Sequence, residues 1–291
     1  MCGVAGFSVK RSIRSDWYKP LLMNLSTRGR DATGVLFRHG DTMTWFKQGT
    51  EASTFCAASQ VHDVCCAPSS MGLLHTRAAT QGSPKDNKNN HPIVLPKIVM
   101  IHNGVVWAGR KYTAKYQGQT DTEELMWDMV ERGEVKALEE VGGSLAIAYF
   151  MRSDPDVLKV FRRGSPIIWT KTKNGFFFAS TSEALKIMGL PEPHYALPEN
   201  QLSSIKKGVV LDTITVADKS DSIYPWNEDS LRAWGGSYNL TYRRQGAVLR
   251  TGVGAHNAEG DLVGDSGEST RWRSAYDPDT RGWACLDEEW K

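Results

Sequence analysis

Cys2 is the residue of this chain whose chemistry depends most on its position. It precedes an apolar run, Gly3-Val4-Ala5-Gly6-Phe7, that predicts a buried strand. If Met1 is removed, the thiol shares one residue with an α-amine, whose pKa of about 8 lets it accept a proton as the sulfur attacks a carbonyl. Cys2 equally fits the commoner role of cysteine, a small buried side chain. The motif alone leaves both interpretations open.

Three further polar clusters follow apolar runs or precede an amphipathic helix. They are His75-Thr76-Arg77-Ala78-Ala79-Thr80, His102-Asn103-Gly104 and Gln119-Thr120-Asp121-Thr122-Glu123-Glu124. We expect them at strand ends or in adjoining loops, where catalytic groups are commonly placed. The three clusters are therefore candidates for a site shared with Cys2.

These clusters supply the donors and charges that acyl transfer from an amino acid requires. The Asn103 amide and the Gly104 N–H can stabilise an oxyanion. Arg77 can bind a carboxylate in bidentate fashion, and Asp121 can bind an ammonium group. Each also has a structural interpretation: Asn103-Gly104 as a turn, Arg77 as a surface ion pair and Asp121 as a helix N-cap. Their order after a cysteine at position 2 favours a functional site.

The composition is that of a globular protein of ordinary charge. The chain has 291 residues, of which 40% are hydrophobic and 23% charged, and its formal net charge is +2. This charge is too small to predict binding to nucleic acid or to a membrane surface. No apolar run is long enough to predict a membrane-spanning helix, and no secretory leader is visible. We therefore expect a cytoplasmic protein, with an oligomeric state that the sequence leaves open.

The cysteines do not form a disulfide framework. They are an odd number without framework spacing: Cys2, Cys56, Cys65, Cys66 and Cys285. A metal site at Cys56, His62 and Cys65-Cys66 is an alternative, but the spacing matches no common zinc pattern. We expect instead a helix that carries these thiols into a core, and we expect neither a metal nor a cofactor.

The chain up to about residue 215 alternates short β-rich runs with turn signals. Strands are predicted at residues 3–9, 33–38, 42–46, 72–75, 98–101, 144–151, 157–161, 167–171, 176–179, 203–205 and 209–213. Helices are predicted at residues 16–26, 52–64, 122–132, 134–140 and 182–188. Lys173-Asn174-Gly175 predicts a hairpin with a tight primed turn. Many short antiparallel strands with few helices predict an α+β fold.

The character of the chain changes at about Tyr224. Residues 224–291 are rich in Gly, Asp, Ser and Arg, contain Trp226 and Trp234, and lose apolar periodicity after Leu249. We expect a main domain over residues 1–223 and a polar extension over 224–291, partly ordered and partly flexible. The extension could wrap onto the main domain, bind a partner or form a flexible tail.

The order of the motifs resembles that of the class II glutamine amidotransferases, whose glutaminase domain belongs to the N-terminal-nucleophile hydrolases. The main matching pieces are Cys2-Gly3-Val4-Ala5-Gly6, Arg28-Gly29-Arg30-Asp31-Ala32-Thr33-Gly34, His75-Thr76-Arg77-Ala78-Ala79-Thr80, Asn90-His91-Pro92, His102-Asn103-Gly104 and Thr120-Asp121-Thr122-Glu123. Weaker matches extend the resemblance over roughly residues 2–215. It implies a four-layer αββα sandwich of two antiparallel sheets.

The resemblance also implies roles for individual residues. Cys2 would attack the side-chain amide of glutamine, releasing ammonia, and Asn103 with Gly104 would form the oxyanion hole. Arg77 would hold the α-carboxylate and Asp121 the α-ammonium group. The remaining implied substrate-site residues are Thr80, His91 and Arg28, the last as a buttress of the N-terminal cysteine. His75 and His102 are interpreted as structural, because the terminal amine serves as the base in this family.

Two departures from the family pattern bear on function. Ala78 stands where family members usually carry an aromatic residue, which predicts a more open glutamine pocket. No motif of a fused synthase half is found, so we expect a stand-alone glutaminase subunit that delivers ammonia to a separate synthase. The alternatives are an amidohydrolase of the same class that acts on a γ-glutamyl compound or another small amide, and an inactive glutamine-binding regulator.

Overall fold

The computed structural model describes residues 1–107, 115–220, 255–256 and 262–263. The chain divides into two units, and the second contributes to the description only strands β14 (Ala255–His256) and β15 (Leu262–Val263), which pair antiparallel. The predicted boundary between residues 223 and 224, with nearly all of the polar extension, lies outside the described residues. The domain division therefore stays a prediction.

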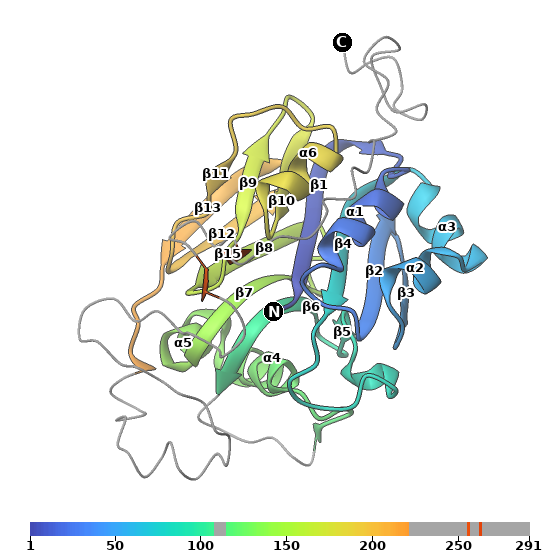
Figure 1. The fold of residues 1–291 in the computed structure, drawn as a ribbon. Coiled ribbons are helices and arrows are strands. Elements are labelled where there is room, and N and C mark those ends of the chain that lie inside the picture. Colours follow the sequence, from blue (N-terminus) through green and yellow to red (C-terminus); the bar gives the residue numbers. More distant parts are fainter. Residues whose placement is uncertain (108–114, 221–254, 257–261, 264–291) are drawn as a thin grey trace. The chain divides into compact units, whose positions relative to one another are not determined.

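The first unit contains a seven-stranded antiparallel sheet (Figure 1). In spatial order its strands are β11 (Tyr195–Ala196), β9 (Ile168–Lys171), β10 (Gly175–Ala179), β1 (Gly3–Ile13), β4 (Ser69–Arg77), β2 (Ala32–His39) and β3 (Thr42–Gln48). The strand that follows Cys2 is thus interior to the sheet, between β10 and β4. This placement fixes the start of the chain on both sides by ladder hydrogen bonds.

A six-stranded antiparallel sheet packs face to face with the first. Its order is β13 (Val209–Thr215), β12 (Gln201–Lys206), β8 (Val157–Arg163), β7 (Gly142–Met151), β6 (Ile98–Trp107) and β5 (Ile93–Val94). Strand β6 carries the Asn103-Gly104 motif and pairs with β7 along its full length. Each sheet therefore contributes one interior strand to the candidate site.

Helices cover the outer face of each sheet (Figure 1). The helices are α1 (Tyr18–Leu25), α2 (Ala52–Cys56), α3 (Ser59–Cys66), α4 (Asp121–Arg132), α5 (Glu134–Glu140) and α6 (Ser182–Ile187), with the 3-10 turn η1 (Asn87–Asn89). Three apolar clusters fill the interfaces between these layers. One lies between the first sheet and helices α1, α2, α3 and α6, one lies between the two sheets, and one lies between the second sheet and helices α4 and α5. The predicted αββα sandwich is confirmed.

The alternation of strand side chains explains this layering. On β1, Ala5, Phe7 and Val9 pack among the helices, whereas Val4 packs between the sheets. Because successive side chains of a strand point to opposite faces, Cys2 lies on the same inner face as Val4. The cysteine is thereby directed towards the second sheet.

Three local predictions are wrong. The helix expected at residues 52–64 is two helices, because Ala58 is extended (φ −73°, ψ 130°) and begins α3 on a new axis. The strand expected at 98–101 continues to Trp107, so Asn103-Gly104 is neither a strand end nor a turn. The hairpin after β9 is present, but its turn is not primed, since neither Asn174 nor Gly175 has a positive φ.

Two other expectations concern membranes and thiols. Among the described residues, no helix is long and apolar enough to cross a membrane. Cys56, Cys65 and Cys66 are buried in the core beneath the first sheet, as predicted. Within the described part of the chain, no group of three or more His, Cys, Asp or Glu side chains is arranged to hold a metal.

Candidate active site

Cys2 lies where the two sheets meet the loop that follows β4. Its side chain is buried, and Gly3 pairs with Thr76 at the end of the β1–β4 ladder. The Cys2 backbone N donates a 2.8 Å hydrogen bond to Asn103 Oδ1, which joins the first sheet to the second. The sequence positions of these two residues are 101 apart, so the bond is a product of the whole fold.

The Cys2 thiol is surrounded by backbone rather than by a basic side chain. The Ala78 N–H donates to Sγ at 3.4 Å, and Sγ lies 3.6 Å from the Ala78 carbonyl oxygen. Burial raises the pKa of the thiol, and so does Asp121, while the Ala78 amide, the α-amine of Met1 and Arg77 each lower that pKa. The groups that favour the thiolate are thus donors and positive charges gathered at this one sulfur.

Asn103 and Gly104 lie inside β6. Asn103 Oδ1 accepts from Cys2, and its Nδ2 is buried without a partner among the described residues. Gly104 has φ +142°, and a Cβ there would approach the Ser144 carbonyl oxygen to 1.9 Å. Only glycine fits this position. Asn103 therefore offers an unused buried donor beside the nucleophile.

Arg77 is buried at the end of β4, so the interpretation as a surface ion pair is wrong. Its Nη1 donates to Asn90 Oδ1 at 2.9 Å, and its Nη2 donates to the carbonyl oxygens of Gln81 and Gly82. Burial lowers the pKa of the guanidinium, and nearby Cys2, Asp31 and Asp121 oppose that shift. The charge is held in place by neutral acceptors.

Asp121 is the first residue of α4 but not its N-cap, as one interpretation of the sequence had it. The cap is Thr120, whose side chain accepts from Glu123 N. Asp121 Oδ2 accepts instead from Val106 N of β6 at 2.8 Å, and Oδ1 accepts from Thr122 N at 2.8 Å. The buried carboxylate ties α4 to the strand that carries Asn103.

Three buried histidines lie beneath these groups. His75 and His91 stack with ring centroids 4.3 Å apart, and His75 Nε2 lies 2.9 Å from the His102 carbonyl oxygen. Both His91 Nε2 and His102 Nδ1 approach Thr122 Oγ1, at 3.3 and 2.9 Å. Burial lowers the pKa of His75 to about 3 and lowers that of His91 and His102 as well. All three are therefore neutral at physiological pH.

The remaining predicted site residues differ in their placement. Arg28 Nε donates to the Cys2 carbonyl oxygen at 3.0 Å, next to the nucleophile. His91 belongs to the buried histidine group, in the segment between η1 and β5. Thr80 is exposed in the loop after β4, three residues beyond Arg77. The structure brings Arg28 to Cys2 and leaves Thr80 at the margin.

The sequence motifs include Asp31 without predicting a role for it, and they predict for Ala78 only the effect of its small side chain on the pocket. Asp31 Oδ2 accepts from Ala79 N at 2.7 Å, and the Ala78 backbone contacts the thiol. Thr122, shared by two histidines and next to Asp121, was also not singled out. The partners of Asp31 are backbone atoms, which a sequence does not display.

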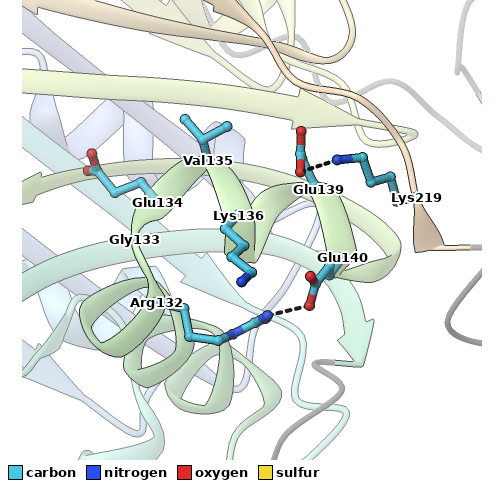
Figure 2. Close-up of a pocket in the computed structure, with 8 residues that line it drawn as sticks. All are labelled: Arg132, Gly133, Glu134, Val135, Lys136, Glu139, Glu140 and Lys219. Atoms are coloured by element: carbon cyan, nitrogen blue, oxygen red, sulfur yellow. Dashed lines mark hydrogen bonds and ion pairs between the residues drawn. The ribbon is translucent and has the colours of Figure 1, made fainter.

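A surface pocket lies elsewhere in the second sheet's helical layer. Figure 2 shows this pocket of about 500 Å³, lined by Arg132, Lys136, Lys219 and neighbouring residues of the α4–α5 corner. Arg132 pairs with Glu140, and Lys219 pairs with Glu139. None of the candidate site residues lines it, so its charges belong to a separate surface.

Comparison with known proteins finds aminotransferases that are named for glutamine. No protein-family profile matches the chain. A glutamine–fructose-6-phosphate aminotransferase (isomerizing) of Chlorobaculum tepidum is 30% identical over 203 residues, which are 62% of this chain and 32% of the relative. Its counterpart in Thermococcus kodakarensis is 28% identical over 249 residues, 78% of this chain and 40% of the relative. The match thus spans a minor part of each relative.

Solved structures share the fold at low identity. A glutamine phosphoribosylpyrophosphate amidotransferase from B. subtilis superposes with a TM-score of 0.58 at 17% identity, covering 74% of this chain and 49% of that one. The structure of an allosteric regulatory enzyme of purine biosynthesis gives the same TM-score at 16% identity. These relatives, the sandwich fold and the ordered motifs agree. The chain therefore contains a domain of the class II glutamine amidotransferase family, with the N-terminal-nucleophile hydrolase fold.

Proposed function

We propose that this domain hydrolyses the side-chain amide of L-glutamine to glutamate and ammonia, with Cys2 as the nucleophile. The observation that carries the proposal is the bond from Cys2 N to Asn103 Oδ1, beside the unpartnered Asn103 Nδ2. One amide side chain thus holds the atom that becomes the α-amine after removal of Met1. The same side chain keeps a donor for the substrate.

The reaction would proceed through a thioester. Sγ attacks the amide carbon while its proton passes to the terminal amine, and the negative charge on oxygen is stabilised by Asn103 Nδ2 and the Gly104 N–H. The amine then protonates the leaving nitrogen, the C–N bond breaks and ammonia departs. A water, activated by the same amine, hydrolyses the glutamyl thioester and regenerates Cys2.

The charged groups near Cys2 suit the amino-acid end of glutamine. A guanidinium has five N–H groups, and Arg77 makes three hydrogen bonds, to Asn90, Gln81 and Gly82, which leaves two for the α-carboxylate. Asp121 would attract the α-ammonium group. Arg28, which holds the Cys2 carbonyl, would position the nucleophile.

Two more residues complete the proposed substrate site. His91 would form the buried wall below it, because it stacks on His75. Thr80, in the exposed loop, would close the substrate pocket. In the described loop no aromatic side chain follows Arg77, since Ala78 occupies that position, and this supports a more open pocket.

We further propose that the ammonia passes to a synthase on a separate polypeptide. The matched region covers 32% of the Chlorobaculum relative, an aminotransferase by name, so most of that protein has no counterpart in this match. Residues 224–291 are the proposed docking arm. A pull-down with full-length protein should recover a partner that a variant lacking 224–291 does not, and equal recovery by both would contradict the arm's role.

Two other functions make different predictions. An amidohydrolase of the same class would act on asparagine or on γ-glutamyl amides but not on glutamine. An inactive regulator would bind glutamine without releasing glutamate. Arg77 and Asp121 suit all three substrates, so only turnover separates them.

The deciding experiment measures glutamate release from L-glutamine by the purified protein, with its intact mass read on the same sample. We expect turnover in protein that lacks Met1, and none in Cys2→Ala. Cys65→Ala is the matched control, because Cys65 is a buried thiol in the core away from Asn103, and it should keep wild-type turnover. Retained turnover in Cys2→Ala would overturn the proposal.

A further inference from the structure

Asp31 makes two hydrogen bonds to the loop that follows β4. Its backbone N donates to the Arg77 carbonyl oxygen at 2.9 Å, and its Oδ2 accepts from the Ala79 N–H at 2.7 Å. These two atoms flank Ala78, whose own N–H and carbonyl oxygen face the Cys2 sulfur at 3.4 and 3.6 Å. Asp31 therefore bonds on both sides of the residue that contacts the nucleophile.

Each contact to Asp31 shares a peptide group with one contact to the Cys2 sulfur. A trans peptide is planar, with its C=O and N–H pointing in opposite directions. In the Arg77–Ala78 peptide, the carbonyl is held by Asp31 and the N–H faces Cys2 Sγ. In the Ala78–Ala79 peptide, the N–H is held by Asp31 and the carbonyl faces Cys2 Sγ. Each peptide group thus bridges Asp31 to the thiol.

The space around this loop is closed on another side. A Cβ on Gly29 would lie 2.4 Å from both Ala78 N and the Arg77 carbonyl carbon. The loop therefore has little freedom to move towards residue 29. Asp31 forms one hydrogen bond to each of the two peptide groups.

We propose that Asp31 is a positioning residue that sets the reactivity of the Cys2 thiol through the two peptide groups of Ala78. The Asp31 N–H holds the Arg77 carbonyl, which turns the Ala78 N–H towards sulfur, and the carboxylate anchors the following peptide at the Ala79 N–H, which keeps Ala78 in place. A sulfur that accepts this N–H is more readily deprotonated. The inference rests on the proposed role of Cys2, but it concerns the thiol itself and can be tested without turnover.

The test is the pH dependence of Cys2 alkylation by iodoacetamide, followed by mass spectrometry of the peptide that contains Cys2. In Asp31→Ala the Ala78 N–H is less well directed at the sulfur. The pH midpoint of the alkylation rate should therefore rise, and alkylation below that midpoint should slow about threefold to tenfold. Simple loss of a negative charge near the thiol would lower the midpoint instead. An unchanged or lowered midpoint overturns the proposal.

Two further variants separate geometry from charge and serve if Asp31→Ala does not fold. Asp31→Asn removes the charge but keeps an acceptor for Ala79 N–H, so it should stay close to wild type. Asp31→Glu keeps the charge but displaces the acceptor, so its midpoint should rise. The reverse pattern, a shift in Asp31→Asn and none in Asp31→Glu, overturns the proposal.

Asp63→Ala is the matched control, because Asp63 is an exposed acid on α3. It should leave the alkylation profile unchanged. In glutamate release, Asp31→Ala should lower kcat, with partial recovery in Asp31→Asn. If the Asp31 variants show the predicted alkylation pattern but the wild-type protein releases no glutamate, the function proposed above fails while the role of Asp31 stands.

Discussion

The molecule buries thiols in two regions that differ in what surrounds them. Cys2 lies at the meeting of the sheets, where the Ala78 amide and Arg77 oppose the effect of burial on its pKa. Cys65 lies in the core beneath the first sheet, where burial and two neighbouring thiols all raise its pKa. Nearby Cys66 has its pKa raised to about 12, and Cys56 to about 11.

The difference shows that burial does not by itself distinguish a reactive thiol from an inert one. Both environments exclude water, and in both the charged form of the thiol loses solvation. At Cys2 a backbone N–H and the positive charge of Arg77 replace part of that solvation, whereas at Cys65 the neighbouring thiols oppose ionisation further. The predictions below alter one region while leaving the other intact.

The largest expected effect comes from Asn103→Ala, which removes both the acceptor of Cys2 N and the unpartnered Nδ2. Loss of one oxyanion donor typically lowers kcat by about 100-fold to 1,000-fold. Glutamate release measures this, with Cys65→Ala expected to keep wild-type kcat. A kcat for Asn103→Ala within threefold of the wild-type value would remove the contrast between the two regions.

Acid should destabilise the site region selectively. Below about pH 6.5 the unfolded chain binds a proton at each buried histidine, whereas folded His75 remains neutral down to a pKa of about 3. Stability should therefore be full above pH 6.5 and fall as the pH decreases. At pH 5 the loss from His75 is about 2 kcal/mol.

Urea unfolding at several pH values measures this slope. In His75→Asn, the slope of the unfolding free energy against pH should decrease by the amount that corresponds to one bound proton. Equal slopes in wild type and His75→Asn would show that His75 is not neutral in the folded protein.

Replacement of each thiol by a hydroxyl should affect stability unequally. Cys65→Ser buries a hydroxyl in an apolar core and should cost about 1–3 kcal/mol. Cys2→Ser can use the Ala78 N–H and carbonyl oxygen as partners, so its cost should stay below about 1 kcal/mol. Urea midpoints of the two variants provide the measurement, and equal losses would contradict the difference in polarity.

The smallest expected effect is a labelling preference among the thiols that the structure describes. At pH 8, iodoacetamide should modify Cys2 at least about tenfold faster than Cys56 and Cys66, because burial raises the pKa of all three thiols but the Ala78 N–H bonds to the Cys2 sulfur and favours its thiolate. Peptide mass mapping in a Cys285→Ser background compares the rates. Faster modification of Cys56 would reverse the assignment of the two regions.

Much of the fold could be predicted because its strands carry long apolar patterns. The predicted strand at 33–38 is β2 (Ala32–His39), and the run at 176–179 is β10. Strands β5 and β11 have two residues each, too few to carry a period. The apolar pattern does not predict the continuation of β6 beyond Ile101, because His102-Asn103-Gly104 interrupts the apolar run.

The candidate site was less accessible to sequence reasoning where backbone atoms take part. Cys2 and Asn103 could be paired through their chemistry, and the structure brings them together. The contact of Cys2 with Ala78, by contrast, uses a peptide group that any residue would supply. Thr120 rather than Asp121 is the N-cap because α4 begins at Asp121, and the composition of this segment does not determine at which of the two residues the helix starts.

The contacts between Ala78 and the nucleophile have a consequence for how this protein tolerates mutation. Because both are made by main-chain atoms, changing the side chain at position 78 leaves them in place. An alanine scan makes no substitution at Ala78 and would register the interaction only indirectly, at Asp31 or Gly29. A different side chain at position 78 would therefore change the surroundings of the sulfur without removing either main-chain contact.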